Sequence, residues 1–174
     1  MALFSRTPKP VSPARHLYDA IVSRAREQVF HTNFAVADSL DGRFDLLTLH
    51  AFAVMDALKP LGPAGGKVGT EFANVIFAGF EDALRQLGVS DMGLGRRIKA
   101  MANAFYGRLE AYGSASGEPE LAAALLRNLY RGEETMRRES EVLAHYISEL
   151  QLRLRAHSEH LLEGRVDFGP LPVM

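Results

Sequence analysis

The amino-acid sequence predicts an all-α protein, folded as a single-domain bundle of about six helices. Apolar residues recur at steps of three and four through most of the 174 residues, which is the spacing of one helix face. The segments between these runs hold the serine, aspartate, glycine and proline residues that start and stop helices. The length suits one domain. The expected core includes Phe44, Leu47, Val54, Phe72, Phe80, Ile98, Met101 and Phe105.

The composition excludes several classes of function. The chain has 20 basic and 21 acidic residues, so its net charge of -1 gives no general attraction to nucleic acid. It has no cysteine, which rules out disulfides, thiolate metal sites and thiol nucleophiles and suits a reducing cytosol. No apolar run approaches the roughly 20 residues that span a bilayer, and the first ten residues lack a signal-peptide core. We therefore expect a soluble, cytoplasmic protein.

Residues 1–12 are expected to form a flexible basic tail. Arg6 and Lys9 have no acidic neighbour in this stretch, and Leu3 and Phe4 lie close to them in the sequence. Chain ends of this kind are commonly disordered. The alternative is that these apolar and basic residues contact an anionic membrane surface.

The first helix is expected from Pro13 to about Phe30. Ser12 can accept a hydrogen bond from a free amide at the helix start, and proline is favoured in the first turn. The apolar stripe of this helix consists of Leu17, Ile21 and Ala25.

The second helix, at about residues 40–58, is predicted to be the buried centre of the bundle. Asp38 or Ser39 can cap its start, and Lys59-Pro60 ends it. Apolar residues cover nearly its whole circumference, which is typical of a helix enclosed by others.

Two polar residues of this helix have open roles. His50 lies at the boundary of the apolar face, where a lone histidine is more often hydrogen-bonded within a core than a ligand or a base. Arg43 can pair with Asp41 or reach outward to a partner, and the sequence does not decide between them.

The segment from Pro60 to Val68 is predicted to be a flexible loop, because it is rich in glycine and proline. Gly66-Lys67 is similar to part of a phosphate-binding loop. The required flanking glycine and hydroxyl residue are replaced by Leu61 and Val68. The third helix is then expected from Thr70 to Leu87. Its acids Glu81 and Asp82 are adjacent in sequence and point apart, so they suit a solvated face better than a catalytic or metal-binding pair.

The fourth helix, at about residues 94–112, carries two opposed surfaces. Its inward stripe is Leu94, Ile98, Met101, Phe105, Leu109 and Tyr112. Gly107 lies on the other side, although a glycine inside a helix costs about 1 kcal/mol relative to alanine. Packing against the chain's own core does not explain it. It would let a partner approach closely, or alternatively a neighbouring helix of the same bundle.

Two more helices are expected, at about residues 121–130 and 134–162, followed by an extended tail at residues 163–174. Residues 13–162 would thus form the helical domain. His157 and His160 are the one pair spaced to seed a metal site on a helix. No matched carboxylate pair accompanies them, and we expect no metal and no cofactor.

A series of short motifs runs through residues 15 to 132. In chain order they are Asp41-Gly42-Arg43-Phe44, Leu49-His50, Leu87-Gly88-Val89 with Asp91, Ala104-Phe105-Tyr106-Gly107-Arg108-Leu109 with Ala111-Tyr112, and Arg127-Asn128. This order resembles the ubiquinol-cytochrome c chaperone family. The most specific part is AFYGRLEAY. The resemblance implies a helical assembly factor that is not an enzyme. In mitochondria such factors help newly made cytochrome b enter respiratory complex III.

The expected function is therefore that of a non-enzymatic chaperone for a client polypeptide, cytochrome b or an assembly intermediate of it. No GxSxG, HExxH or GxGxxG motif supports an enzyme. The expected partner-binding residues are Arg96, Lys99, Asn103, Tyr106, Gly107, Arg108 and Arg43.

Other interpretations stay open. One is a helical protein or enzyme that binds quinone or haem between its helices, with His50, Tyr106 and Tyr112 in the pocket. Another is an adaptor for a different partner such as a ribosome. The resemblance also leaves open a small partner subunit, as in mitochondrial relatives, and a peripheral place at the cytoplasmic face of the inner membrane.

Overall fold

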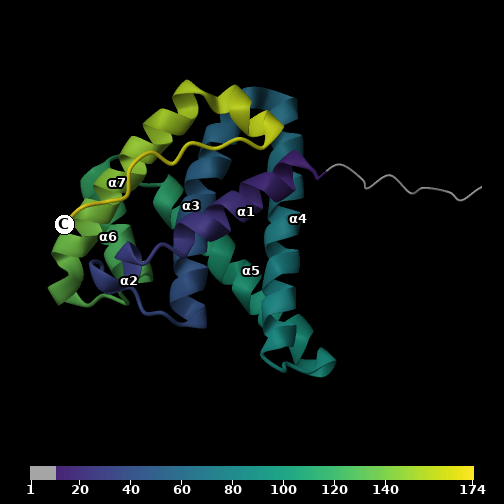
Figure 1. Cartoon of the computed structure of the whole chain (residues 1–174). Helices are drawn as coiled ribbons and strands as arrows, with labels where there is room; N and C mark the ends of the chain where they lie inside the picture. The colour runs from purple at the N-terminus through teal and green to yellow at the C-terminus, as the bar shows by residue number, and fades with distance from the viewer. Residues whose placement is uncertain (1–10) are drawn as a thin grey trace, which may run out of the picture.

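The computed structural model describes residues 11–174, so the predicted basic tail lies almost wholly outside the described residues. Within residues 11–174 the chain is all-helical, without strands, as predicted (Figure 1). Its α-helices are α1 (Pro13–Ala25), α2 (Val29–Thr32), α3 (Leu40–Leu58), α4 (Gly62–Gln86), α5 (Asp91–Gly113), α6 (Glu118–Asn128) and α7 (Arg137–Ala156). Short 3-10 helices occupy Lys59–Leu61, Glu134–Met136 and Ser158–Glu163. The sequence predicts that the first helix continues to about Phe30, but α1 ends at Ala25 and the separate four-residue α2 follows.

Helix α3 is the centre of the bundle, as its apolar sequence predicts. It contacts α1, α4, α5 and α7 (Figure 1), and most of its residues are buried. Its start is fixed by Ser39, whose hydroxyl accepts a hydrogen bond from the Gly42 amide at 3.2 Å. The N-cap and the buried position are both confirmed.

The predicted loop at residues 60–68 is wrong, because α4 already begins at Gly62. Pro63 lies in its first turn, where proline costs no hydrogen bond. Gly65 lies against the preceding helix end, and a Cβ atom at this position would stand 2.0 Å from the Leu58 carbonyl oxygen. The glycines therefore permit a tight corner between α3 and α4, where the sequence pattern indicates only flexibility.

Helices α4 and α5 form a hairpin whose turn is the lowest point of the molecule in Figure 1. Leu84 is the last buried residue before this turn, and Leu94 is the first buried residue after it. Ile98 and Met101, both predicted to be core residues, are only partly buried, because the first half of α5 reaches toward the protruding turn. The other predicted core residues are buried, namely Phe44, Leu47, Val54, Phe72, Phe80 and Phe105.

The C-terminal helices α6 and α7 lie on the side of α3 that faces away from α4 (Figure 1). Helices α6 and α7 lie against each other, and α7 ends at Ala156 because the backbone of His157 leaves the helical region (φ -134°, ψ 37°). The predicted continuous helix to Leu162 is therefore wrong, and a 3-10 helix replaces its last turns. From Gly164 the chain has no regular structure and runs back across the bundle to α7 (Figure 1).

Candidate functional site

The DGRF motif at the start of α3 contributes mainly to the fold. A Cβ atom on Gly42 would lie 1.9 Å from the Ala37 carbonyl oxygen, so only glycine fits there. The Phe44 ring packs against Phe80, with 5.2 Å between the ring centroids. Arg43 is exposed, and its Nε donates a hydrogen bond to Asp38 at 2.8 Å. The predicted alternative that Arg43 pairs with Asp41 is therefore wrong, and its ion-pair partner is Asp38.

A buried ion cluster lies next to Phe44. The carboxylate of Asp45 is 1% exposed and faces the guanidinium groups of Arg108 and Arg131, each at 2.8 Å. Burial raises the pKa of the Asp45 carboxyl, against the opposing effect of the two arginines. Arg108 also stacks on the Phe44 ring at 5.1 Å. The cluster ties α3, α5 and the turn after α6 together.

Arg108 therefore differs from the other predicted partner-binding residues, because its charge is used within the fold. Its side chain turns from the flank of α5 toward the core, where it neutralises Asp45. The long arginine side chain allows this inward turn from a position that helical spacing places at the edge of the outer face. No local pattern indicates this pairing, since Asp45 and Arg108 lie in different helices.

His50 belongs to a second buried network. Its ring is fully buried, with Nδ1 2.8 Å from the Leu46 carbonyl oxygen and Nε2 3.0 Å from the Tyr146 hydroxyl. Because a carbonyl only accepts hydrogen bonds, Nδ1 carries the proton and Nε2 accepts from Tyr146. Burial lowers the pKa of His50 to about 4, so the ring is neutral at physiological pH. The predicted core role of His50 is confirmed.

This network does not match a quinone or haem pocket built from His50, Tyr106 and Tyr112. Both ring nitrogens of His50 are already hydrogen-bonded within the protein, so neither is free to bind iron. Tyr112 is buried against Phe52, whereas Tyr106 is 51% exposed on the outside of α5. The three residues have different environments and do not face a common space.

Five of the predicted partner-binding residues lie together on the solvent side of α5. This outer α5 surface consists of Arg96, Lys99, Asn103, Tyr106 and Gly107, all exposed. A Cβ atom on Gly107 would meet nothing within 4 Å. No helix of residues 11–174 therefore packs on Gly107, and the alternative that it serves close packing within the bundle is wrong.

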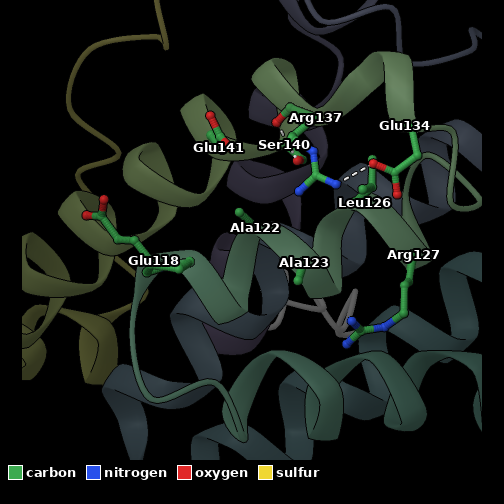
Figure 2. Close-up of a pocket in the computed structure, with 10 residues that line it drawn as sticks. Glu118, Ala122, Ala123, Leu126, Arg127, Glu134, Arg137, Ser140 and Glu141 are labelled. Carbon is green, nitrogen blue, oxygen red and sulfur yellow. Dashed lines mark hydrogen bonds and ion pairs between the residues drawn. The ribbon is translucent and has the colours of Figure 1, made fainter.

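A cavity with a volume of about 490 Å³ lies between α6 and α7 (Figure 2). Ala122, Ala123 and Leu126 contribute apolar surface to it. Its charged residues carry both signs: Figure 2 shows Glu134 ion-paired with Arg137 at one end and Glu118 at the other. This mixture selects no particular charge of ligand.

Two adjoining clefts lie beside the start of α3, with volumes of about 300 and 390 Å³. They share Leu40, Phe44 and Met101, and their walls are largely apolar. The cationic residues around them are Arg26, Arg43, Arg97, Arg108 and Arg131. An apolar cleft with cationic edges suits an amphiphile or a peptide better than a small polar substrate.

Neither a metal site nor a membrane span is found in the part of the chain that the structure describes. His157 and His160 stack with 5.5 Å between their ring centroids, and residues 11–174 contain no group of three or more potential metal ligands. None of the described helices is long and apolar enough to cross a bilayer.

Comparison with known proteins supports the resemblance. The family model described as ubiquinol-cytochrome C chaperone matches residues 32–168. Assembly factor 1 of the ubiquinol-cytochrome-c reductase complex from Xenopus laevis is 26% identical over 162 residues, which cover 91% of this chain and 81% of that protein. Its namesake from Mus musculus is 25% identical over 162 residues, 91% of this chain but only 55% of the mouse protein.

A solved structure agrees with these matches. The crystal structure of the Cbp3 homolog from Brucella abortus superimposes with a TM-score of 0.81 at 33% sequence identity. The match covers 91% of this chain and 89% of that one. The family model, the relatives and the shared fold agree, and the chain belongs to the ubiquinol-cytochrome c chaperone family.

Proposed function

We propose that this protein is a non-enzymatic assembly factor for the ubiquinol-cytochrome c reductase complex. Membership of the chaperone family and the names of the two relatives support this role. The client would be newly made cytochrome b or an assembly intermediate that contains it. This protein would shield the exposed apolar surface of the client by reversible contacts until the next subunit or cofactor arrives. The engaged ring nitrogens of His50 favour this role over a haem or quinone carrier.

The outer α5 surface is our proposed client site. The observation that supports it is the open space around Gly107. In the most specific family motif, Phe105 is buried in the core and Arg108 pairs with Asp45, so the fold accounts for both. No contact within residues 11–174 requires a glycine at position 107, and a glycine there weakens the helix. A glycine on an exposed helix face lets another backbone come close, and Tyr106 offers an aromatic contact beside it.

Arg43 is a secondary candidate for partner binding. Its ion pair with Asp38 is exposed on both sides. Such pairs contribute little to stability, so an acidic group of a partner can replace Asp38 at small cost. For this reason we place Arg43 at the edge of the proposed interaction.

The proposed place of action is the cytoplasmic face of the inner membrane, with the protein bound peripherally. A membrane-protein client is made and inserted at that surface, so a factor that holds it must work there. A small partner subunit, as the family resemblance implies for mitochondrial relatives, would bind elsewhere on the helical domain.

The client site can be tested with two substitutions at one position. Gly107→Ala should stabilise the isolated protein by up to about 1 kcal/mol, because the helix gains propensity and no atom blocks the new methyl group. Gly107→Leu should leave the fold intact and greatly reduce the capture of cytochrome b. Capture is measured by crosslinking to newly made cytochrome b, and stability by thermal unfolding.

Gly66→Leu is the matched control. Gly66 is also an exposed helical glycine, and a Cβ atom there would likewise meet nothing within 4 Å, but it lies in the first turns of α4. This variant should capture the client normally. A large loss of stability in both Gly107 variants, or normal capture by Gly107→Leu, would contradict the proposed site.

A further inference from the structure

The turn between α4 and α5 protrudes from the bundle. It forms the lower end of the molecule in Figure 1. Between the buried residues Leu84 and Leu94, none of the residues 85–93 is buried. Gly88 has a positive φ of 78°, which lets the chain reverse sharply between the two helix ends. We call residues 85–99 the hairpin tip.

Two large apolar side chains are exposed at this tip. Leu87 is 62% exposed and Met92 is 94% exposed. Leu87 follows the last residue of α4, and Met92 lies in the first turn of α5, so they flank the turn. The sequence predicts Leu87 to be part of the apolar face of its helix. In the structure Leu87 is mostly exposed at the edge of a cleft beside the start of α3, because the hairpin extends past the core.

The tip also has an excess of positive charge. Its acid Asp91 is neutralised by Arg85 at 2.6 Å, and Arg85 also pairs with Glu81 at 2.9 Å. Arg96, Arg97 and Lys99 are all exposed on the next turns of α5. None of these three forms an ion pair with residues 11–174. Three unneutralised cations therefore stand directly behind two exposed apolar side chains.

We propose that the hairpin tip docks on an anionic lipid bilayer. Leu87 and Met92 would enter the interface, and Arg96, Arg97 and Lys99 would lie among the phosphate groups. Exposed apolar side chains flanked by cations are the chemistry by which peripheral proteins bind such surfaces. Leu87 and Met92 are exposed on a protruding turn (Figure 1), and a protruding turn can enter a soft headgroup layer.

This inference can be tested apart from the client proposal, since the purified chain should bind lipid without any client, although Arg96 and Lys99 belong to both proposed surfaces. The proposed docking also determines how far the outer α5 surface lies from the membrane. Gly107 lies 15 positions after Met92, or about 22 Å along the helix axis at about 1.5 Å per residue. A chain docked by its tip would thus hold Tyr106 and Gly107 close to the membrane surface.

The test is co-sedimentation of the full-length protein with vesicles of equal parts phosphatidylglycerol and phosphatidylcholine at low salt. The wild-type protein should bind these vesicles and bind pure phosphatidylcholine vesicles far less. Arg96→Gln/Lys99→Gln should weaken binding about twenty-five-fold, at about fivefold for each cation removed. Leu87→Ser/Met92→Ser should also weaken it at least several-fold. All four side chains are exposed, so thermal unfolding should be nearly unchanged.

Matched controls lie on the other side of the molecule. Leu152 in α7 is 61% exposed, and Leu152→Ser should bind like the wild-type protein. Arg127→Gln/Arg138→Gln removes two exposed cations from α6 and α7 and should cost little binding. The proposal is overturned if the wild-type protein fails to bind the anionic vesicles, or if the controls lose as much binding as the tip variants. It is also overturned if Arg6→Gln/Lys9→Gln abolishes binding while both tip variants bind normally.

Discussion

Gly42 and Gly107 stand in similar short motifs, each directly before an arginine, yet the fold uses them differently. Gly42 lies against the backbone of Ala37, where a Cβ atom has no room. Gly107 faces open space. Their arginines also differ, because Arg43 forms an exposed pair with Asp38 and the partly buried Arg108 pairs with the buried Asp45. Residue type alone therefore does not separate a structural glycine from one available to a partner.

Replacement of Gly42 by alanine should destabilise the protein. The new methyl group would collide with the Ala37 carbonyl oxygen, and relief of such overpacking typically costs about 1 to 3 kcal/mol. Chemical denaturation of Gly42→Ala measures the loss, with Gly107→Ala as the reference of equal chemical change. Equal stability of the two variants would show that the start of α3 can move away without cost.

At the scale of elements, α3 is joined to its neighbours by polar groups as well as apolar packing. Asp45 links it to α5 through Arg108 and to the turn after α6 through Arg131. His50 links it to α7 through Tyr146, whose hydroxyl also accepts a hydrogen bond from Arg24 of α1 at 2.9 Å. The buried helix is thus held in one register, because each polar group has one set of partners.

Removal of Arg108 alone should be costly, and removal of the acid as well should restore much of the loss. Arg108→Met leaves the buried Asp45 carboxylate with only the half-exposed Arg131, and breaking such a pair costs about 3 to 5 kcal/mol. Adding Asp45→Asn removes the buried charge, so the double variant should be more stable than Arg108→Met. A double-mutant cycle in urea measures this coupling. Additive losses would contradict it.

At the scale of the whole molecule, the buried polar networks connect distant parts of the chain. Arg24 contacts Tyr146 and also donates hydrogen bonds to the carbonyl oxygens of Gly169 and Pro170. Phe168 packs edge-on against His50 at 5.8 Å between ring centroids. The C-terminal segment therefore covers the His50 network, and global unfolding must expose His50 to water.

Stability should fall on mild acidification because of His50. Burial lowers its pKa from the ordinary value of 6.5 to about 4 in the folded protein, so unfolding takes up a proton between these values. The contribution is complete above about pH 6.5 and is lost as the pH falls toward 4. It amounts to about 3 kcal/mol at about 1.4 kcal/mol per pKa unit.

Denaturant unfolding across this pH range tests the effect. His50→Gln cannot gain a proton and should show a flatter dependence of stability on pH than the wild-type protein. Replacement of the exposed His16 by glutamine is the control and should leave the slope unchanged. A wild-type slope in His50→Gln would assign the pH dependence to other groups.

The sequence by itself determined the helical class, the buried central helix, its cap at Asp38 or Ser39, and the family; the structure decided for Ser39. It also placed Gly107 and its neighbours on the outer side of α5. These features depend on local spacing, because helical geometry fixes which residues three and four apart share a face. The glycine and proline content before Val68 predicted a loop, wrongly, because these residues form a tight corner and the first turns of α4. The periodic pattern predicted a buried Ile98 and Met101, which are only partly buried, since the pattern contains no information on where a helix runs past its neighbours.

Only the tertiary structure decided which polar residues meet. Asp45 pairs with Arg131 across 86 positions, and His50 reaches Tyr146 across 96. It likewise decided that Arg108 turns inward and that Leu87 is exposed on the hairpin tip. The physical reason is that the burial and charge partners of a side chain depend on elements remote in sequence, whereas helix formation depends on neighbours within a few residues.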